Sequence, residues 1–348
     1  MNAILDRIGD GWALTLAGLV VGLLFGAAGR HSSFCFRAAT IEVGRGVWGS
    51  RLAVWLIGFA VAVAATQTAV IAGLFDPSQT RQIANAGSLS GAVIGGAMFG
   101  VGMVLARGCA SRLLILSATG NLRALVTGLI LTIVAQASLR GFLSPAREKL
   151  AALWIVPGGS GRDLLSVVHL GPVAGVLFGL IVLAIGIRLA RSRAVPLAHM
   201  SSAVVAGAAI ALGWVLTFAL AGLIFEGGKV TSVTFIGPSA DTLMGLINTP
   251  ALPLSFDFGL IPGVFAGSLI ATLWLGEFRW QSFEGGTSML RYLTGACLMG
   301  FGGMLAGGCA VGAAVTGTSI FALTGILTLF SMALTGITAD RLIDRPSE

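Results

Sequence analysis

The chain is dominated by long apolar stretches that alternate with short polar or glycine-rich segments. A stretch of about 17 to 25 apolar residues is long enough to cross a bilayer as a helix. The sequence therefore predicts an all-α integral membrane protein with about nine transmembrane helices. The expected spans are residues 12–29, 52–74, 88–106, 123–140, 167–188, 200–225, 258–276, 292–307 and 318–339.

Composition and charge agree with a membrane location. Hydrophobic residues make up 56% of the chain and the mean hydropathy is +0.95, which is more than the surface of a water-soluble domain carries. The net charge of +7 is explained by basic cytoplasmic loops, so nucleic-acid binding is not predicted. The basic turns at 30–51 and 188–193 place the N-terminus outside and the C-terminus inside. The first apolar run continues to Phe25 without a cleavage site, so we expect it to be a span.

Two short segments of the chain are closely similar. GVGMVLARGCA at 100–110 and GFGGMLAGGCA at 300–310 share seven of eleven positions, including Cys109 and Cys309. SSFCF at 32–36 aligns with TSVTF at 231–235, which pairs Cys35 with Thr234. The two cysteine segments belong to the third and eighth spans, which run in opposite directions. The sequence thus predicts an inverted internal repeat.

We expect one transmembrane transporter domain over residues 1–348, built from two pseudo-repeats at 1–140 and 200–340. Residues 141–199 form a connecting span and loops. The segments 30–50, 107–122 and 226–257 are too polar or glycine-rich for simple spans, and short re-entrant half-helices are predicted there. In transporters with inverted repeats, the substrate binds near the bilayer midplane where broken helices from the two halves meet.

The chemistry of the cysteine segments points to an anion. Each glycine-rich run ends in Gly-Cys-Ala, after which another helix can begin, and unpaired backbone N–H groups at a helix start attract anions. A thiol is soft and a weak hydrogen-bond donor, so it suits a sulfur-containing anion better than phosphate or chloride. Gly108 and Gly308 would permit close backbone approach. Arg107, two residues before Cys109, and Arg112, three residues after it, add positive charge to the first copy only. Gly307 and Gly312 stand at the matching positions of the second copy.

Other chemistry is not indicated by the sequence. No metal-ligand spacing, no phosphate-binding loop and no nucleophile with a base are found, so we predict no metal, no cofactor and no enzymatic activity. Glu226, Lys229, Asp241 and Asp257 are predicted to be solvated loop charges. Cys297, whose matching residue is Ala97, is predicted to be a packing residue.

The whole chain resembles the YeeE/YedE family of bacterial inner-membrane sulfur transporters, whose studied members take up thiosulfate. The resemblance rests on LARGCA, LAGGCA, HSSFCFR at 31–37, VTSVTFIGPSADTL at 230–243, and FDFGLIPGVFAGS followed by EFRW. It implies nine transmembrane helices with short half-helices in two pseudo-symmetric halves. It also implies that Cys35, Cys109 and Cys309 contact thiosulfate along a central route. A small TusA-like cytoplasmic sulfur-relay protein, encoded as a separate chain, is an implied partner.

Three functions are compatible with the sequence. The first is an importer of thiosulfate or a related soft sulfur anion across the bacterial inner membrane, with Cys35, Cys109, Cys309, Gly108, Gly308, Arg107 and Thr234 as substrate-binding residues. The second is a membrane thiol protein that transfers sulfur through a covalent persulfide. The third is a structural membrane protein in which the cysteines only pack. The sequence leaves open the exact substrate, the energy coupling and the order in which the thiols meet the substrate.

Overall fold

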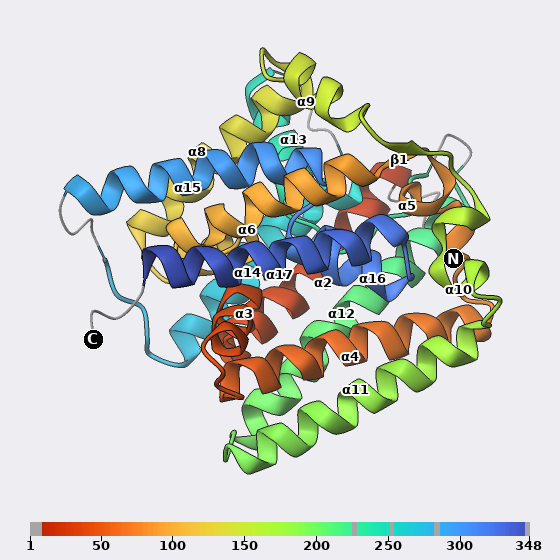
Figure 1. The fold of residues 1–348 in the computed structure, drawn as a ribbon, viewed down its shortest axis with the longest axis horizontal. Helices are drawn as coiled ribbons and strands as arrows, with labels where there is room; N and C mark the ends of the chain where they lie inside the picture. Colours follow the sequence, from red (N-terminus) through yellow and green to blue (C-terminus); the bar gives the residue numbers. More distant parts are fainter. Residues whose placement is uncertain (1–8, 225–227, 249, 251–253, 282–285, 345–348) are drawn as a thin grey trace.

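A computed structural model describes residues 9–224, 228–248, 250, 254–281 and 286–344. Within these residues, nine helices are long and apolar enough to cross a membrane. Figure 1 shows the long helices side by side, with α5, β1 and α10 gathered at one end of the molecule. The spanning helices are α2 (Asp10–Ser32), α4 (Ser50–Ile71), η2 with α6 (Gly91–Gly95 and Gly96–Leu105), α8 (Leu122–Arg140), α11 (Pro172–Ser192), α12 (Leu197–Ala221), α14 (Phe256–Trp274), α15 (Gly286–Leu305) and α17 (Leu323–Ile343).

Short elements connect these helices. The two strands β1 (Gly87–Ser88) and β2 (Ile155–Val156) pair antiparallel and are the only sheet among the described residues. The fold is therefore all-α, as the sequence predicts. The short helices are η1 (Pro77–Gln79), α3 (Phe36–Gly44), α5 (Arg81–Ala84), α7 (Ala110–Ser117), α9 (Ser144–Ala151), η3 (Ser160–Arg162), α10 (Leu164–Val167), α13 (Ile236–Asn248), η4 (Ala310–Thr316) and α16 (Gly317–Ser319).

Glycines bring α2 and α14 into close parallel contact. Gly18, Gly22 and Gly26 follow one another at intervals of four on α2, and Gly259, Gly263 and Gly267 do the same on α14. A Cβ atom on Gly22 would lie 2.5 Å from the Leu260 carbonyl oxygen, and one on Gly263 would lie 2.6 Å from the Leu19 carbonyl oxygen. Small residues at this spacing allow backbones to approach in a membrane, where van der Waals packing holds helices together.

The helix α6 packs antiparallel against α15, also through glycines. A Cβ atom on Gly95 would lie 2.4 Å from the Gly302 carbonyl oxygen, and one on Gly102 would lie 2.7 Å from the Gly295 carbonyl oxygen. In the sequence alignment of the repeat, Gly102 matches Gly302 and Gly95 matches Gly295. The contact between Gly95 and Gly302 is thus repeated by their counterparts Gly295 and Gly102, as expected for two halves related by a two-fold axis.

Other helix contacts are repeated in the same way by the matching helices of the other half. Helix α2 packs on α14 while α12 packs on α4, and α6 packs on α17 while α15 packs on α8. Helix α3 contacts α17 in the way that α13 contacts α8. These pairings support an inverted repeat, whose boundaries at residues 140 and 200 stay a prediction.

Side-chain hydrogen bonds hold neighbouring elements together at each end of the helix bundle. At one end, Arg45 donates to Asp340 at 2.8 Å, and Arg291 donates to Asp344 at 2.8 Å, which holds the end of α17 beside α3 and α15. Hydrogen bonding to Asp340 raises the pKa of the Arg45 guanidinium, so this residue stays charged at ordinary pH. At the other end, the buried Arg162 donates to the Thr324 hydroxyl at 2.9 Å and to the Asn85 carbonyl.

Candidate functional site

Each of the three cysteines in the predicted site stands at the start of a short helix. Cys35 precedes α3, Cys109 precedes α7 and Cys309 precedes η4, and all three have extended backbone conformations. The new helix leaves the N–H groups of its first turn without helical partners, so they remain available around each cysteine. This arrangement confirms the prediction that a helix begins after each Gly-Cys-Ala segment.

A left-handed residue two positions before each cysteine ends the preceding helix. Ser33 has φ 55°, Arg107 has φ 53° and Gly307 has φ 82°. In the two repeated segments, the next N–H donates to the carbonyl oxygen five residues earlier: Gly108 donates to Met103 at 3.1 Å and Gly308 donates to Gly303 at 2.8 Å. This pattern closes the C-terminus of a helix. The repeat therefore conserves a backbone turn at Arg107 and Gly307 even though the side chains differ.

Cys309 interacts with η4, the helix that it precedes. It also lies near residues 231–235, the segment that matches the Cys35 segment in the repeat. Its Sγ atom accepts a hydrogen bond from the Gly312 N–H at 3.4 Å. Gly312 packs against Thr234, since a Cβ atom on Gly312 would lie 2.0 Å from the Thr234 hydroxyl oxygen. The structure thus brings Thr234 beside the start of the η4 helix.

In the first half of the chain, Cys35 and Cys109 occupy the positions that match Thr234 and Cys309. Their thiols lie beside each other, and Cys109 Sγ is 3.3 Å from the Ser111 hydroxyl oxygen. Arg112, which occupies the position of Gly312, acts electrostatically on both thiols. Arg112 Nη1 is buried and has no hydrogen-bond partner, so its positive charge is available to an anion.

Arg107 is placed differently from Arg112. Its side chain is exposed, and its positive charge acts on Arg37. Arg37 and Arg112 are the two arginines that act electrostatically on Cys35. The role of Arg107 as a substrate contact stays a prediction, whereas Arg112 is the buried cation next to the paired thiols. Its spacing of three residues after Cys109 is the sequence signal that identifies it.

The two glycines of the Gly-Cys-Ala segments have different surroundings. A Cβ atom on Gly308 would lie 2.9 Å from the Ala313 backbone nitrogen, so the backbone approaches closely there. A Cβ atom on Gly108 would meet no heavy atom nearer than 3.5 Å, which is an ordinary contact distance. Close approach of this kind is therefore found at Gly308 and not at Gly108.

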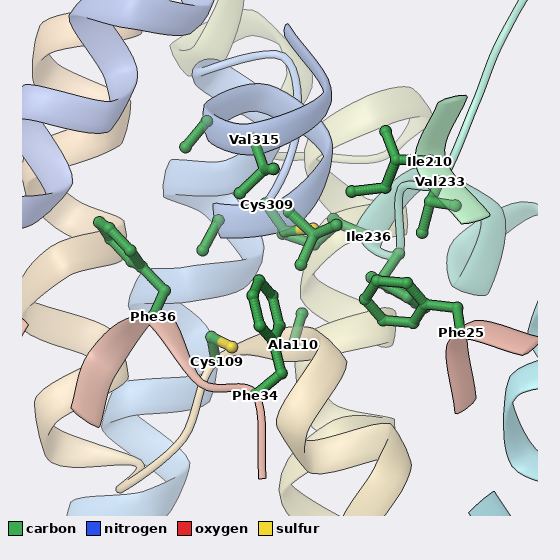
Figure 2. Close-up of a cluster of buried hydrophobic side chains, with 14 of the residues drawn as sticks. Phe25, Phe34, Phe36, Cys109, Ala110, Ile210, Val233, Ile236, Cys309 and Val315 are labelled. Carbon is green, nitrogen blue, oxygen red and sulfur yellow. The ribbon is translucent and has the colours of Figure 1, made fainter. Parts of the chain in front are cut away.

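Apolar side chains enclose the thiols. Cys109 is 2% exposed and Cys309 is 1% exposed, and both belong to one buried cluster. Figure 2 shows the Phe34 ring between Cys109 and Cys309, Ile236 at Cys309, and Phe25, Val233 and Val315 farther out. Side chains thus fill the space between the two thiols in this conformation.

A cavity opens at the end of the molecule that is predicted to face outside. Its volume is about 740 Å³, and it lies among the end of α8, the start of α14 and helix α13. The charged side chains that line it are Arg140, Lys229, Asp241 and Asp257. Thr231 also lines it, and the same segment continues to Thr234 beside the η4 helix.

The prediction that the outer charges are all solvated is wrong for Asp257. Asp257 is the second residue of α14, and its Oδ1 atom is buried with no hydrogen-bond partner. Asp241 is exposed, as predicted, and Glu226 lies outside the described residues. The sequence placed Asp257 in a loop because the apolar run of α14 becomes continuous only at Phe258.

Cys297 differs from the other three cysteines. It is exposed in the middle of α15, so it does not pack in the core as predicted. Exposure on a spanning helix places this thiol toward lipid. It provides a matched control for substitutions at the buried cysteines.

Residues 31–338 match the family described as sulphur transport. The chain belongs to the sulphur transport family. It is 26% identical to the thiosulfate transporter TsuA of Escherichia coli, an alignment that covers 95% of each chain. It is 27% identical to the thiosulfate transporter TsuA of Spirochaeta thermophila, over 89% of this chain and 93% of the relative.

Family membership and the nine apolar helices assign a multi-pass membrane protein with a role in sulfur transport. The relatives are named as transporters and not as enzymes. The family match begins at His31 and includes all three cysteines at helix starts, together with Arg112.

Proposed function

We propose that this protein imports thiosulfate, or a related soft sulfur anion, across the bacterial inner membrane. The observation that carries the proposal is the adjacency of the Cys35 and Cys109 thiols to Arg112, whose Nη1 atom is buried without a hydrogen-bond partner. A sulfur oxyanion has a soft terminal sulfur and charged oxygens. Thiols suit the former, and an arginine with backbone N–H groups suits the latter.

The route begins at the outer cavity, where Arg140 and Lys229 attract the anion. The segment from Thr231 to Thr234 leads from this cavity to Cys309, and the Cys35 and Cys109 pair follows on the inner side. Gly308 lets the backbone approach closely beside Cys309. Passage requires Phe34 to move, because its ring lies between Cys109 and Cys309 in the closed conformation.

Uptake of radioactive thiosulfate in cells that lack other uptake routes tests the proposal. We expect Cys109→Ala and Cys309→Ala to lower the uptake rate by at least about tenfold, which corresponds to about 1.4 kcal/mol of lost interaction in the transition state. Cys297→Ala, at the lipid-facing thiol, is expected to leave uptake unchanged. Undiminished uptake in both variants of the buried cysteines would contradict the role of the thiols.

Serine variants separate softness from hydrogen bonding. Cys109→Ser and Cys309→Ser keep a donor of similar size but replace a polarizable sulfur by a hard oxygen. Slow uptake in the serine variants indicates that the soft sulfur matters. Normal uptake in the serine variants with slow uptake in the alanine variants indicates that a donor is sufficient.

A covalent sulfur-transfer mechanism is the alternative, and the adjacency of Cys35 and Cys109 favours it. In that mechanism a cysteine thiolate attacks the outer sulfur of thiosulfate, the S–S bond of thiosulfate breaks, sulfite leaves, and the cysteine keeps the sulfur as a persulfide. Intact-protein mass measurement after exposure to thiosulfate decides between the two. A mass increase of one sulfur atom on a buried cysteine supports transfer, and an unchanged mass during active uptake supports transport.

The partner on the cytoplasmic side is proposed to be a separate TusA-like sulfur-relay protein, as the family resemblance implies. Co-purification of the two proteins from membranes tests this partnership. Uptake that is the same in cells with and without the relay protein would show that import does not require it.

A further inference from the structure

The outer cavity contains three buried oxygen atoms that have no hydrogen-bond partner. They are Asp257 Oδ1, Gln136 Oε1 and Thr242 Oγ1, which come from α14, α8 and α13 and line the same cavity. Buried polar atoms are normally paired, so three unpaired oxygens in one cavity indicate that something binds there. Oxygen acceptors favour a cation or a proton.

Asp257 differs from the other carboxylates of the described chain. Asp340 and Asp344 bind arginines at the inner end, and Glu42 accepts from the backbone N–H of Leu52. No ion pair reaches Asp257 in the described residues, although positive side chains are present in the same region. A buried carboxylate oxygen without a hydrogen-bond partner is costly when the group is charged, and binding a proton removes the charge.

The charges around Asp257 make its protonation relevant to an anion. The described side chains that line the cavity carry two positive charges, on Arg140 and Lys229, and two negative charges, on Asp241 and Asp257. With Asp257 ionised these charges cancel, and with Asp257 neutral the net charge is positive. A dianion therefore binds more favourably when Asp257 carries a proton.

Other charged groups also lie near Asp257. Arg81 of α5 acts on it electrostatically, as do Asp241 of α13 and Lys229. Helix α2, which packs against α14, begins at Asp10, and this side chain is exposed. The start of α14 itself favours a negative charge through the helix dipole, which opposes protonation in the absence of an anion. Anion binding and proton binding are thus coupled in this cavity.

We propose that Asp257 is a proton-binding group that becomes neutral when a sulfur oxyanion occupies the outer cavity. One proton from the outer solution binds the Asp257 carboxylate for each dianion bound, and no bond within the anion changes. The inference rests on the proposed function because it concerns the same anion. The bound proton would also offset part of the charge of a dianion that must move toward the negative side of a membrane.

Calorimetry of thiosulfate binding to the purified full-length protein tests the inference. Thiosulfate stays a dianion between roughly pH 5 and pH 8, so titrations in buffers with different ionisation enthalpies count the protons that the protein takes up. We expect an uptake approaching one proton per anion where Asp257 is ionised in the free protein. In that range, each unit decrease in pH should lower the Kd by about tenfold.

Two variants make the measurement specific. Asp257→Asn keeps the size of the side chain and is permanently neutral, so it should bind thiosulfate without proton uptake and without a change of Kd with pH. Asp241→Asn removes an exposed carboxylate from the same cavity and should retain the proton uptake. Equal proton uptake in Asp257→Asn and the wild type would overturn the inference.

The wild-type protein alone also gives a decision if Asp257→Asn does not fold. Thiosulfate binding with no proton uptake between roughly pH 5 and pH 8 overturns the inference and leaves the proposed function intact. Binding that requires sodium in place of choline and takes up no protons overturns it in favour of a sodium site. A folded wild-type protein that neither binds nor takes up thiosulfate would overturn the proposed function and the inference together.

Discussion

At the residue scale, the two halves use the same backbone turn with different charges. Arg107 and Gly307 both adopt the left-handed conformation that ends a helix, and neither is buried. The positions three residues after the cysteines differ in a more consequential way: Arg112 supplies a buried cation, and Gly312 leaves room for Thr234. The halves therefore contribute different chemistry, one with a cation and two thiols, the other with a hydroxyl and one thiol.

A substitution of Arg112 distinguishes function from stability. Arg112→Gln removes the positive charge next to Cys35 and Cys109, so we expect the KM for thiosulfate uptake to rise by roughly tenfold to a hundredfold. The melting temperature should stay the same or rise, because a buried guanidinium nitrogen without a partner is removed. Uptake kinetics and thermal unfolding in detergent measure the two effects.

Arg107→Gln is the matched control for Arg112→Gln. Arg107 is exposed, so its loss should change the KM by much less. A larger effect at Arg107 than at Arg112 would assign the anion contact to Arg107 after all.

At the element scale, glycines on helix faces determine which spans can touch. The parallel pair α2 and α14 and the antiparallel pair α6 and α15 are both closest at glycines. A Cβ atom at these positions would overlap a backbone carbonyl, which has no alternative rotamer. Movement of one half against the other during transport would have to occur at other contacts, such as the apolar cluster around Phe34.

Gly22→Ala tests the α2 and α14 contact. The added methyl group would lie 2.5 Å from the Leu260 carbonyl oxygen, so the helices must separate. We expect the free energy of unfolding to fall by about 1 to 3 kcal/mol, as for other overpacked sites. Val20→Ala on the same helix, where the side chain is 48% exposed, should have little effect on the melting temperature in detergent. Similar melting temperatures for both variants would show that the contact can open at little cost.

At the scale of the whole molecule, the structure is closed between an outer cavity and the inner thiol pair. Import of a dianion into a negative interior also costs about 4.6 kcal/mol at 100 mV, twice the value for one charge. A closed conformation prevents leakage, and the coupled proton proposed above would reduce the electrical cost. These two features suit a transporter that alternates between open states better than a permanently open channel.

Chemical labelling tests whether Cys109 is closed off from water. In a variant that keeps Cys109 as its only cysteine, reaction with a water-soluble maleimide should be slow, because Cys109 is 2% exposed. Phe34→Ala in that background should increase the labelling rate by removing the ring that lies next to this thiol. Phe59→Ala, which empties a comparably buried site where Phe59 stacks on Trp55, should not. Fast labelling of Cys109 before any further substitution would contradict a closed conformation.

The number and approximate ends of the spans could be predicted from the sequence, because each apolar stretch must match the bilayer by itself. The helix starts after Cys109 and Cys309 were also predictable, since a Gly-Cys-Ala segment that follows a glycine-rich helix is a local signal. The positive charge of Arg112 beside Cys109 was predicted, but its proximity to Cys35 and the burial of the Asp257 Oδ1 atom were not. Both depend on which helices surround the residue, and hydropathy along the chain does not contain that information.

The sequence by itself determined a membrane protein of nine apolar helices with duplicated cysteine segments, because hydropathy, span length and local turns are properties of short stretches. Only the tertiary structure decided that Cys35 lies beside Cys109, that Thr234 packs on Gly312, and that Asp257 faces a cavity without a partner. These contacts join residues that are separated by 70 or more positions or belong to different helices. They arise from the close approach of backbones at glycines, which is a property of helix pairs and not of single segments.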